Sequence, residues 1–343
     1  MPKVQSQRKF LNEINGFFKE RQFFTRYCPQ LNTHCVNILE DAVPVCHFIN
    51  EETFIFDDLH AEGYETLSAR APLQMDCIKT ALITLAKLHA SGLILEEVKS
   101  FRLVDDFEEE LKESFYLGTD STEFAMRSCK SGIRALIDLT HRDDMKISKD
   151  LFTVKALEGC DLQKTFTKPS TRFRNTVCHA DPWTKNFMFK FEEGKAINCV
   201  AVDFQTYRYG PPAQDVLAFI HLVTDRDFRS RHMNELLHFY YEKLDDNVEK
   251  FGFKNVVTKE EFFDSCRYFQ QFALTQTITH FQVVILSDEI ANELFADPEN
   301  ARFVLFENKY DFFKMVCEKD PLFRKKNFEL IDELREFYEN RLL

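Results

Sequence analysis

One stretch near the middle of the chain constrains the fold more than any other. Residues 179–186 read His-Ala-Asp-Pro-Trp-Thr-Lys-Asn, and a second aspartate, Asp203, follows a short distance later. Between them, two apolar runs of strand length, 187–191 and 197–202, flank a polar turn that contains Gly194. Such turns join antiparallel strands. The pattern predicts a β-hairpin with polar side chains directly before its first strand and after its second.

The polar residues around this hairpin are of the types that phosphoryl transfer requires. Asp181 is the candidate catalytic base that accepts the proton of a hydroxyl substrate. Asn186 and Asp203 are candidate ligands for Mg²⁺, which prefers carboxylate and amide oxygens. The alternative is an ordinary hairpin with exposed aspartates. The order of the parts is that of a kinase-like phosphotransferase, and we favour that interpretation.

Two other residues of the loop have an ambiguous role. His179 is a second candidate catalytic residue, either as a general base or, more typically for its place before Asp181, as a residue that orders the loop by hydrogen bonding. Lys185 could contact the transferred phosphate or be solvated. The chain has no D-F-G or A-P-E sequence, which disfavours a protein kinase.

Several stretches together resemble the ecdysteroid kinase-like family, which is related to choline and aminoglycoside kinases. Besides the loop and hairpin, the matching stretches are 18–24 (Phe-Lys-Glu-Arg-Gln-Phe-Phe), 54–59 (Phe-Ile-Phe-Asp-Asp-Leu), 85–90 (Leu-Ala-Lys-Leu-His-Ala) and 210–216 (Gly-Pro-Pro-Ala-Gln-Asp-Val). The resemblance covers roughly residues 1 to 290.

The resemblance implies an α+β, protein-kinase-like fold of two lobes, with a remnant of the N-terminal lobe and hinge at 1–60 and a large helical C-terminal lobe at 61–343. It implies ATP and Mg²⁺ as cofactors and a small-molecule hydroxyl as acceptor, an ecdysteroid being one candidate. It also implies site residues outside the loop: Glu20 on a helix facing the cleft, Asp57, Asp58 and Leu59 at the adenine hinge, and Asp215 bracing the catalytic loop.

Two features depart from the family pattern. Ala180 and Pro182 stand where the family usually has Gly and Leu, and the proline favours extended geometry at Ala180 and Asp181. The family also has a glycine-rich loop and a strand lysine before the Glu helix. This chain has only nine glycines and starts at Met1, close to that helix. We therefore expect a truncated N-terminal lobe and a Glu20 without its lysine partner.

These departures leave a second functional hypothesis open. A chain without the phosphate-binding loop and lysine could be a truncated product or a degenerate relative of the family. It would then be a catalytically impaired or non-catalytic, kinase-like protein that binds small molecules.

Composition excludes several other classes. The net charge of −12 and the lack of a basic block argue against nucleic acid as a partner. No apolar run approaches 18 residues, so we expect no membrane span. The ten cysteines form no C-x-x-C pair and predict no zinc site; without a secretory signal, they are typical of reduced thiols in a cytoplasmic protein.

Periodicity predicts the remaining elements. We expect a helix over 10–27 that ends at Pro29, two antiparallel strands over 43–49 and 53–57, and a helix over 73–91 with Gly92 as its C-cap and His89 in a structural role. Further helices are expected at 101–117, 122–140, 148–163, 216–224, 230–251, 259–286, 299–317 and 323–341.

Overall fold

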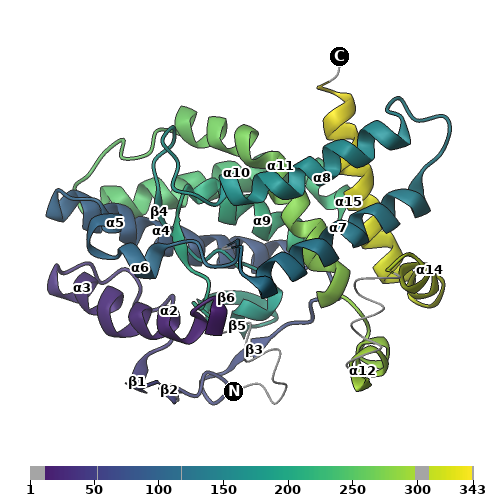
Figure 1. The fold of residues 1–343 in the computed structure, drawn as a ribbon. Helices are drawn as coiled ribbons and strands as arrows, with labels where there is room; N and C mark the ends of the chain where they lie inside the picture. Colours follow the sequence, from purple (N-terminus) through teal and green to yellow (C-terminus); the bar gives the residue numbers. More distant parts are fainter. Residues whose placement is uncertain (1–11, 52, 117, 298–308, 342–343) are drawn as a thin grey trace. The chain divides into compact units, whose positions relative to one another are not determined.

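A computed structural model describes residues 12–51, 53–116, 118–297 and 309–341. The described chain is of mixed α/β type, mostly helical, with short strands (Figure 1). It divides into two compact units. The first contains Met1–Leu117, Thr167–Thr224 and Phe228–Phe269, and the second contains Gly118–Phe166, Asp225–Asp227 and Gln270–Leu343. Every strand of the described residues and every predicted site residue belongs to the first unit.

The strands form three small antiparallel sheets. β1 (Cys46–Ile49) pairs with β2 (Phe54–Phe56), β3 (Tyr64–Thr66) and β6 (Lys195–Ala201) flank β5 (Phe187–Glu192), and β4 (Thr176–Cys178) pairs with β7 (Arg208–Gly210). The four predicted strands are confirmed in position as β1, β2, β5 and β6. The other three strands, each three residues long, were not predicted.

The β5–β6 hairpin has the predicted turn. Glu193 and Gly194 both have positive φ, 49° and 77°, as a tight turn between antiparallel strands requires. Phe187 pairs with Ala201 at the other end of the ladder. One step beyond, the N–H of Val202 donates to the carbonyl of Asn186 at 3.0 Å. The register therefore places Asn186 beside the strand end that carries Asp203.

Helix α4 (Met75–Lys99) forms the centre of the first unit. It packs on β4 and β6 and is buried over most of its length. The prediction that it ends at Gly92 is wrong, because Gly92 serves packing. A Cβ at Gly92 would lie 2.5 Å from Thr176 Oγ1 and 3.0 Å from the N atom of Val177. The close approach of β4 therefore accounts for the glycine at this position, and the helix continues past it to Lys99.

The same helix bears on the membrane question. α4 is long and apolar enough to cross a membrane by length and composition, contrary to the expectation that no such segment exists. Its apolar window is 78% buried inside the protein, so the apolar side chains are accounted for by the core that they form.

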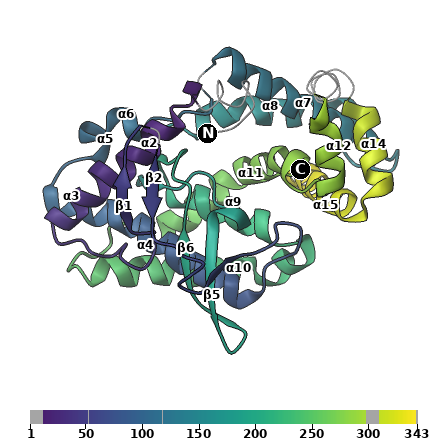
Figure 2. The same cartoon turned by 90° about the horizontal axis from the view of Figure 1, so that it is seen from below.

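The predicted helix over 10–27 is replaced by a longer, irregular helical path. Asn15, with φ 53°, precedes α2 (Gly16–Gln22), which runs into a π-helical turn (Phe23–Tyr27) and then α3 (Cys28–Thr33). The prediction that Pro29 ends the helix is wrong, because Pro29 lies in the first turn of α3, where a proline is tolerated. Figures 1 and 2 show α2 and α3 beside the β1–β2 hairpin, and Phe24 contacts Phe56 across this junction at 4.9 Å.

The other helices of the described residues lie close to the predicted positions, but their number differs from the number predicted. They are α5 (Leu103–Asp106), α6 (Glu108–Leu111), α7 (Asp120–Thr140), α8 (Lys149–Phe166), α9 (Pro212–Val223), α10 (Arg226–Glu249), α11 (Lys259–Val284), α12 (Asp288–Ala296), α14 (Lys309–Lys319) and α15 (Pro321–Glu339). The helix predicted over 101–117 is wrong: Phe107, with φ −124°, interrupts it because its ring is buried against Tyr27. α12 was not predicted, and part of the helix predicted over 299–317 lies outside the described residues.

At the level of class, the mixed, mostly helical architecture agrees with the α+β prediction. The division into lobes at 1–60 and 61–343, and the truncation of the first lobe, stay predictions.

Candidate active site

The carboxylate of Asp215 holds the predicted catalytic loop. Asp215 lies in the first turn of α9 and is 1% exposed. Its Oδ2 accepts the backbone N–H of His179 at 2.6 Å, and its Oδ1 accepts that of Ala180 at 3.0 Å. His89 Nε2 lies 3.1 Å from Oδ2. One buried carboxylate thus fixes two consecutive peptide groups of the loop, which is the geometry that bracing requires.

His89 connects this carboxylate to the core. Its Nδ1 lies 2.5 Å from the hydroxyl of Tyr240, so both ring nitrogens are engaged. His89, Cys178 and Asp215 bring ligand atoms within 4.8 Å of one another, but each is already hydrogen-bonded, Cys178 to the carbonyl of Gly210 at 3.1 Å. The cluster therefore functions as a hydrogen-bonded network and we assign no metal to it. The structural role predicted for His89 is confirmed.

The charge of Asp215 is stabilised by its neighbours. Burial by itself would raise the pKa of this carboxyl, but the hydrogen bond and positive charge of His89, with the charge of Arg208, outweigh burial and lower the pKa below its usual value. Asp215 is consequently ionised at neutral pH in spite of its burial.

Ala180 has an unusual backbone conformation. Its φ is 70°, in the left-handed region that an alanine seldom occupies. The expectation of extended geometry at Ala180 is therefore wrong. A proline restricts only the residue directly before it, which is Asp181, while the two bonds to Asp215 turn Ala180 the other way. A glycine, which the family usually has here, would adopt this conformation without strain.

Asp181 and Asn186 are in direct contact. The side-chain N–H₂ of Asn186 donates to the backbone carbonyl of Asp181 at 2.9 Å and to its Oδ2 at 3.1 Å. A short 3₁₀ turn over Thr184–Asn186 closes the loop between them. Since the amide nitrogen faces Asp181, the Oδ1 atom of Asn186 is left to accept other partners.

Asp203 lies beside this pair in an environment opposite to that of Asp215. Burial and then the nearby charge of Asp181 raise the pKa of its carboxyl. Its Oδ2 accepts a hydrogen bond from Gln205 Nε2 at 3.1 Å, and no cation is paired with it in the described ranges. Its φ of 67° is also left-handed. Strained backbone and uncompensated charge both concentrate at functional sites.

The ring of His179 connects the two halves of this arrangement. Its Nδ1 accepts the N–H of Asp181 at 3.4 Å, and its Nε2 lies 3.0 Å from the carbonyl of Val202, so that Nε2 carries the proton and donates. The ring is fully buried against Phe204. With both nitrogens engaged, these contacts are those of a residue that orders the loop.

Glu20 reaches the same region from α2. Its Oε1 accepts the N–H of Phe204 at 3.3 Å. Burial and then the charge of Asp203 raise its pKa to about 7. The preceding residue, Lys19, points elsewhere: its Nζ donates to the carbonyl of Lys112 at 2.6 Å. Across the part of the chain that the structure describes, Glu20 has no ion-pair partner.

A cavity of about 270 Å³ brings Glu20, Asp203 and the predicted hinge together. The lining residues are Glu20, Phe24, Pro44, Phe56, Asp57, Asp58, Leu59, His60, Met188, Val202 and Asp203. Asp58 forms a turn in which its Oδ1 accepts the N–H groups of His60 and Ala61 at 3.1 and 3.2 Å. Leu59 N–H donates to the carbonyl of Asp57. Asp57 itself pairs with His47.

Sequence reasoning missed several residues of this region. Phe24 and Met188 line the cavity, and Phe23 stacks on Phe204 with ring centroids 3.8 Å apart. The alternation of β5 could have identified Met188, because it points to the face opposite Phe187 and Phe189. No local signal identifies Phe23 or Phe24, since the helical pattern alone does not say which apolar face meets the site.

The model of the ecdysteroid kinase-like family matches residues 1–253 of the chain. The comparison with curated proteins gave no match.

Among solved structures, the chain is similar to an ethanolamine kinase of Plasmodium vivax, at 14% identity and a TM-score of 0.39, over 86% of this chain and 72% of that one. It is similar to a choline kinase of Cryptosporidium parvum, at 12% identity and a TM-score of 0.39, over 91% of this chain and 81% of that one. A choline/ethanolamine kinase family protein from Mesorhizobium loti gives 13% identity and a TM-score of 0.33, over 89% and 83% of the two chains.

Proposed function

The chain belongs to the ecdysteroid kinase-like family, and we propose that it transfers the γ-phosphate of ATP to the hydroxyl group of a small molecule. Family membership supports small-molecule kinase activity in general. The observation that carries the finer proposal is the convergence of Asp181, Asn186 and Asp203 at one end of the β5–β6 hairpin, with Asp215 holding the loop between them.

The donor set at this point fits a divalent cation. Glu20 and Asp203 have raised pKa values, each because of burial and of the other carboxylates nearby. Within the described residues neither has a basic partner. Asn186 directs its amide nitrogen to Asp181, which leaves an amide oxygen for a ligand. Hard oxygen donors with unbalanced negative charge are what Mg²⁺ prefers. Asn186 and Asp203 would hold it, and it would supply charge neutralisation of the phosphates.

The cavity between Glu20, Asp203 and the hinge is the proposed nucleotide site. Apolar side chains, among them Phe56, Met188 and Val202, form walls suited to a planar base. The backbone of Asp57 to Leu59 would hydrogen-bond the adenine. Among the described residues, the N–H of Asp58 donates to no acceptor in the protein, which leaves it available to a base.

In the proposed reaction, Asp181 would orient the acceptor hydroxyl and accept its proton. The hydroxyl oxygen would form a bond to the γ-phosphorus while the bond from that phosphorus to the β–γ bridging oxygen breaks, so that ADP leaves. The N–H₂ of Asn186 fixes the carboxylate that performs this step. His179 and Asp215 keep the loop in place, so that the reacting groups lose little freedom on the way to the transition state. The reaction is largely one of positioning, and the buried network supplies that positioning.

The acceptor is proposed only by class. The family description makes an ecdysteroid one candidate, and small alcohols are the general class. An acidic chain without a basic block makes nucleic acid an unsuitable partner. The cytoplasm, where ATP is available, is the proposed location.

The direct test is ADP release by the purified full chain with Mg-ATP and a panel that includes an ecdysteroid and simple amino alcohols. Acceptor-dependent ADP release that falls about 10²-fold or more in Asp181→Asn, the usual scale for a general base, would support the proposal. Asp246→Asn, an exposed carboxylate on α10, is the matched control. Equal turnover in Asp181→Asn and the parent would remove Asp181 from the mechanism.

A second candidate function is favoured by one observation. In the described ranges Glu20 contacts the backbone of Phe204 and no lysine, whereas phosphoryl transfer in kinases uses a Lys–Glu ion pair near the phosphates. A protein that binds a nucleotide and a small molecule, but does not transfer phosphate rapidly from one to the other, would not need this ion pair. Mg-ATP binding without acceptor-dependent ADP release across the panel would favour this candidate.

A further inference from the structure

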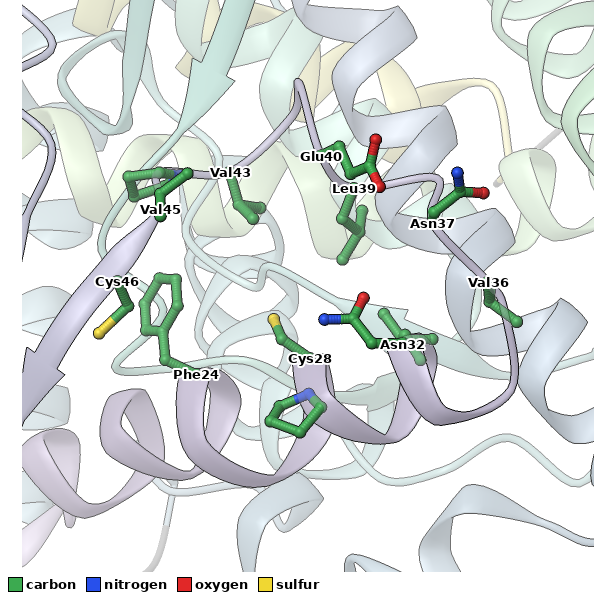
Figure 3. A pocket seen from close by; sticks show the side chains of 13 residues that line it. Phe24, Cys28, Asn32, Val36, Asn37, Leu39, Glu40, Val43, Val45 and Cys46 are labelled. Carbon is green, nitrogen blue, oxygen red and sulfur yellow. The ribbon is translucent and has the colours of Figure 1, made fainter.

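A second cavity lies next to the proposed nucleotide site. It has a volume of about 350 Å³ and lies between the helical path of η1 and α3 and the loop that leads into β1. Figure 3 shows the side chains of Phe24, Cys28 and Asn32 from the helices and of Leu39 and Val43 from the loop around a common space. Nothing in the proposed phosphoryl transfer uses this cavity.

The interior walls of the cavity are formed by buried apolar side chains. Leu31, Val36 and Leu39 are 1%, 1% and 5% exposed and line it from two sides. Cys28 and Cys46 add two thiols, and burial raises the pKa of both, that of Cys28 to about 12. These thiols stay protonated and act as small apolar groups. A cavity of this size with such walls is typical of a small-molecule site.

The rim of the cavity is polar and carries one charge. Asn32, Asn37 and Glu40 line it and are exposed. Among the described residues, none of these three side chains has a hydrogen-bond or ion-pair partner in the protein, and no lysine or arginine lines the cavity. An apolar interior with amide oxygens and one unpaired carboxylate at its mouth is complementary to a molecule with an apolar body and an ammonium head.

Phe24 connects the two cavities. It lines both of them, as does Pro44. The Phe24 ring lies 4.9 Å from that of Phe56, next to the hinge, and 5.9 Å from that of Phe204, next to Asp203. A molecule that packs on one face of this ring therefore acts on the residues that border the nucleotide site.

We propose that the cavity behind Phe24 is an effector site for a small amphipathic amine, and that its occupancy is transmitted to the nucleotide cavity through Phe24. The apolar body lies against Leu31, Leu39 and Phe24, and the ammonium group lies beside Glu40. Whether the amine binds in this cavity does not depend on the proposed function. Its role as a regulator of nucleotide binding does rest on the proposed function.

The binding test uses 4-phenylbutylamine and its neutral analogue 4-phenylbutan-1-ol, titrated calorimetrically into the full chain. We expect the amine to bind more tightly than the alcohol by at most about fivefold, the scale of an exposed ion pair, and this preference to vanish in Glu40→Gln. Asn32→Phe, which places a ring at the mouth of the cavity, should weaken the amine about tenfold or more. Thr33→Phe, exposed on the same helix outside the cavity, should bind like the parent.

The coupling test uses amide hydrogen exchange without nucleotide. Saturating 4-phenylbutylamine should slow exchange in segments 54–59 and 203–207 of the parent by at least about threefold and leave Asn32→Phe unchanged. No binding, or equal binding by Asn32→Phe and the parent, overturns the site. Binding without a change in these segments overturns the coupling. Because neither readout involves ATP, failure of the proposed kinase activity would be seen separately, as absent ADP release.

Discussion

Asp215 is buried and Asp203 is half-buried. Both lie next to the same loop, but their surroundings shift their pKa values in opposite directions. Asp215 accepts two backbone N–H groups and pairs with His89, and its pKa is lowered in spite of burial. Asp203 has one hydrogen bond, from Gln205, and its pKa is raised by burial and by Asp181. The folded protein compensates the negative charge of Asp215 and leaves that of Asp203 largely uncompensated.

The difference separates structural from ligand-binding acids. A buried charge that the protein compensates stabilises the fold, while one that it does not compensate costs stability until something else binds. Asp215 is in the first class. We propose that Asp203, with Glu20 near it, is in the second, and that the cation therefore binds on the Asp203 side of the loop.

The largest expected effect of breaking this contrast is at Asp203. Asp203→Asn keeps the shape and removes the charge, so the part of the nucleotide affinity that depends on Mg²⁺ should be lost. The apo protein should be as stable as the parent or more so, because an uncompensated, half-buried charge is gone. Calorimetric titration of a non-hydrolysable ATP analogue with and without Mg²⁺, together with urea denaturation, measures both.

Asp246→Asn serves as the control for that experiment, since Asp246 is exposed. A mutant Asp203→Asn with the parent's Mg²⁺-dependent affinity would show that the two aspartates do not differ in the way proposed here. So would a clear loss of stability in the apo mutant.

The second expected effect is a loss of stability on substitution of Asp215, opposite in sign to the effect on stability expected at Asp203. Asp215→Asn places an N–H₂ group against N–H donors and should destabilise the protein by about 3 kcal/mol, the scale of breaking a buried, hydrogen-bonded charge. Because the folded pKa of Asp215 is lowered, its contribution is present above the unfolded pKa and is lost as the pH falls through the folded value. The unfolding free energy of the mutant should therefore be lower than that of the parent by the whole of this amount at pH 7, and the difference should become smaller as the pH falls into the acid range.

A deficit that stays constant as the pH falls below the ordinary aspartate range would contradict the assignment of a stabilising charge to Asp215. A deficit below about 0.5 kcal/mol at pH 7, the level expected for a surface change, would show that the loop is held by other contacts.

The parts of the site that the sequence predicted are those encoded locally. The β5–β6 hairpin is specified by its apolar runs and its turn, and the turn fixes the register that brings Asn186 beside Asp203. The motif residues follow from that register. Family resemblance, by contrast, was needed to place Asp215, because nothing in the sequence near it indicates which loop it contacts.

The parts that were not predicted depend on contacts between distant segments. Gly92 resembles a helix end in the sequence, but the close approach of β4 decides its role. Phe107 lies in a helical pattern, but burial against Tyr27 breaks the helix there. The burial of Lys19, one residue before Glu20, also has no local signal. Each case is a tertiary contact that overrides a local preference.

Lys19 provides the third prediction, a dependence on pH. The side chain is 1% exposed, and burial, opposed by Glu113 and reinforced by Arg208, lowers its pKa to about 7. The folded pKa lies below the unfolded value of 10.5, so the unfolded chain binds more protons between them and stability rises with pH across this window. Lys19→Met should remove a rise of about 2 kcal/mol between pH 7 and pH 9.

The measurement is the difference in unfolding free energy between the parent and Lys19→Met at the two pH values, since cysteine and tyrosine titration is common to both proteins. Lys79→Met, at a partly exposed ion pair with Glu235, should show almost no such difference. Equal slopes for the parent and Lys19→Met would mean that Lys19 keeps an ordinary pKa.

The smallest effect tests whether the bonds to Asp215 hold the loop in a strained conformation. Ala180 has φ 70°, and a left-handed conformation costs an alanine roughly 1–2 kcal/mol that a glycine does not incur. Glycine loses more backbone entropy on folding, by roughly 0.4–1 kcal/mol. Ala180→Gly should therefore be neutral or stabilising by up to about 1 kcal/mol, whereas Ala125→Gly inside α7 should cost about 1 kcal/mol.

Combined with Asp215→Asn, Ala180→Gly should lose its stabilising effect, because a loop released from the carboxylate of Asp215 can relax the backbone of its alanine. Urea denaturation of the double-mutant cycle decides the matter: additive free energies would show that the conformation of Ala180 does not depend on Asp215, and a positive coupling would show that the brace maintains the strain.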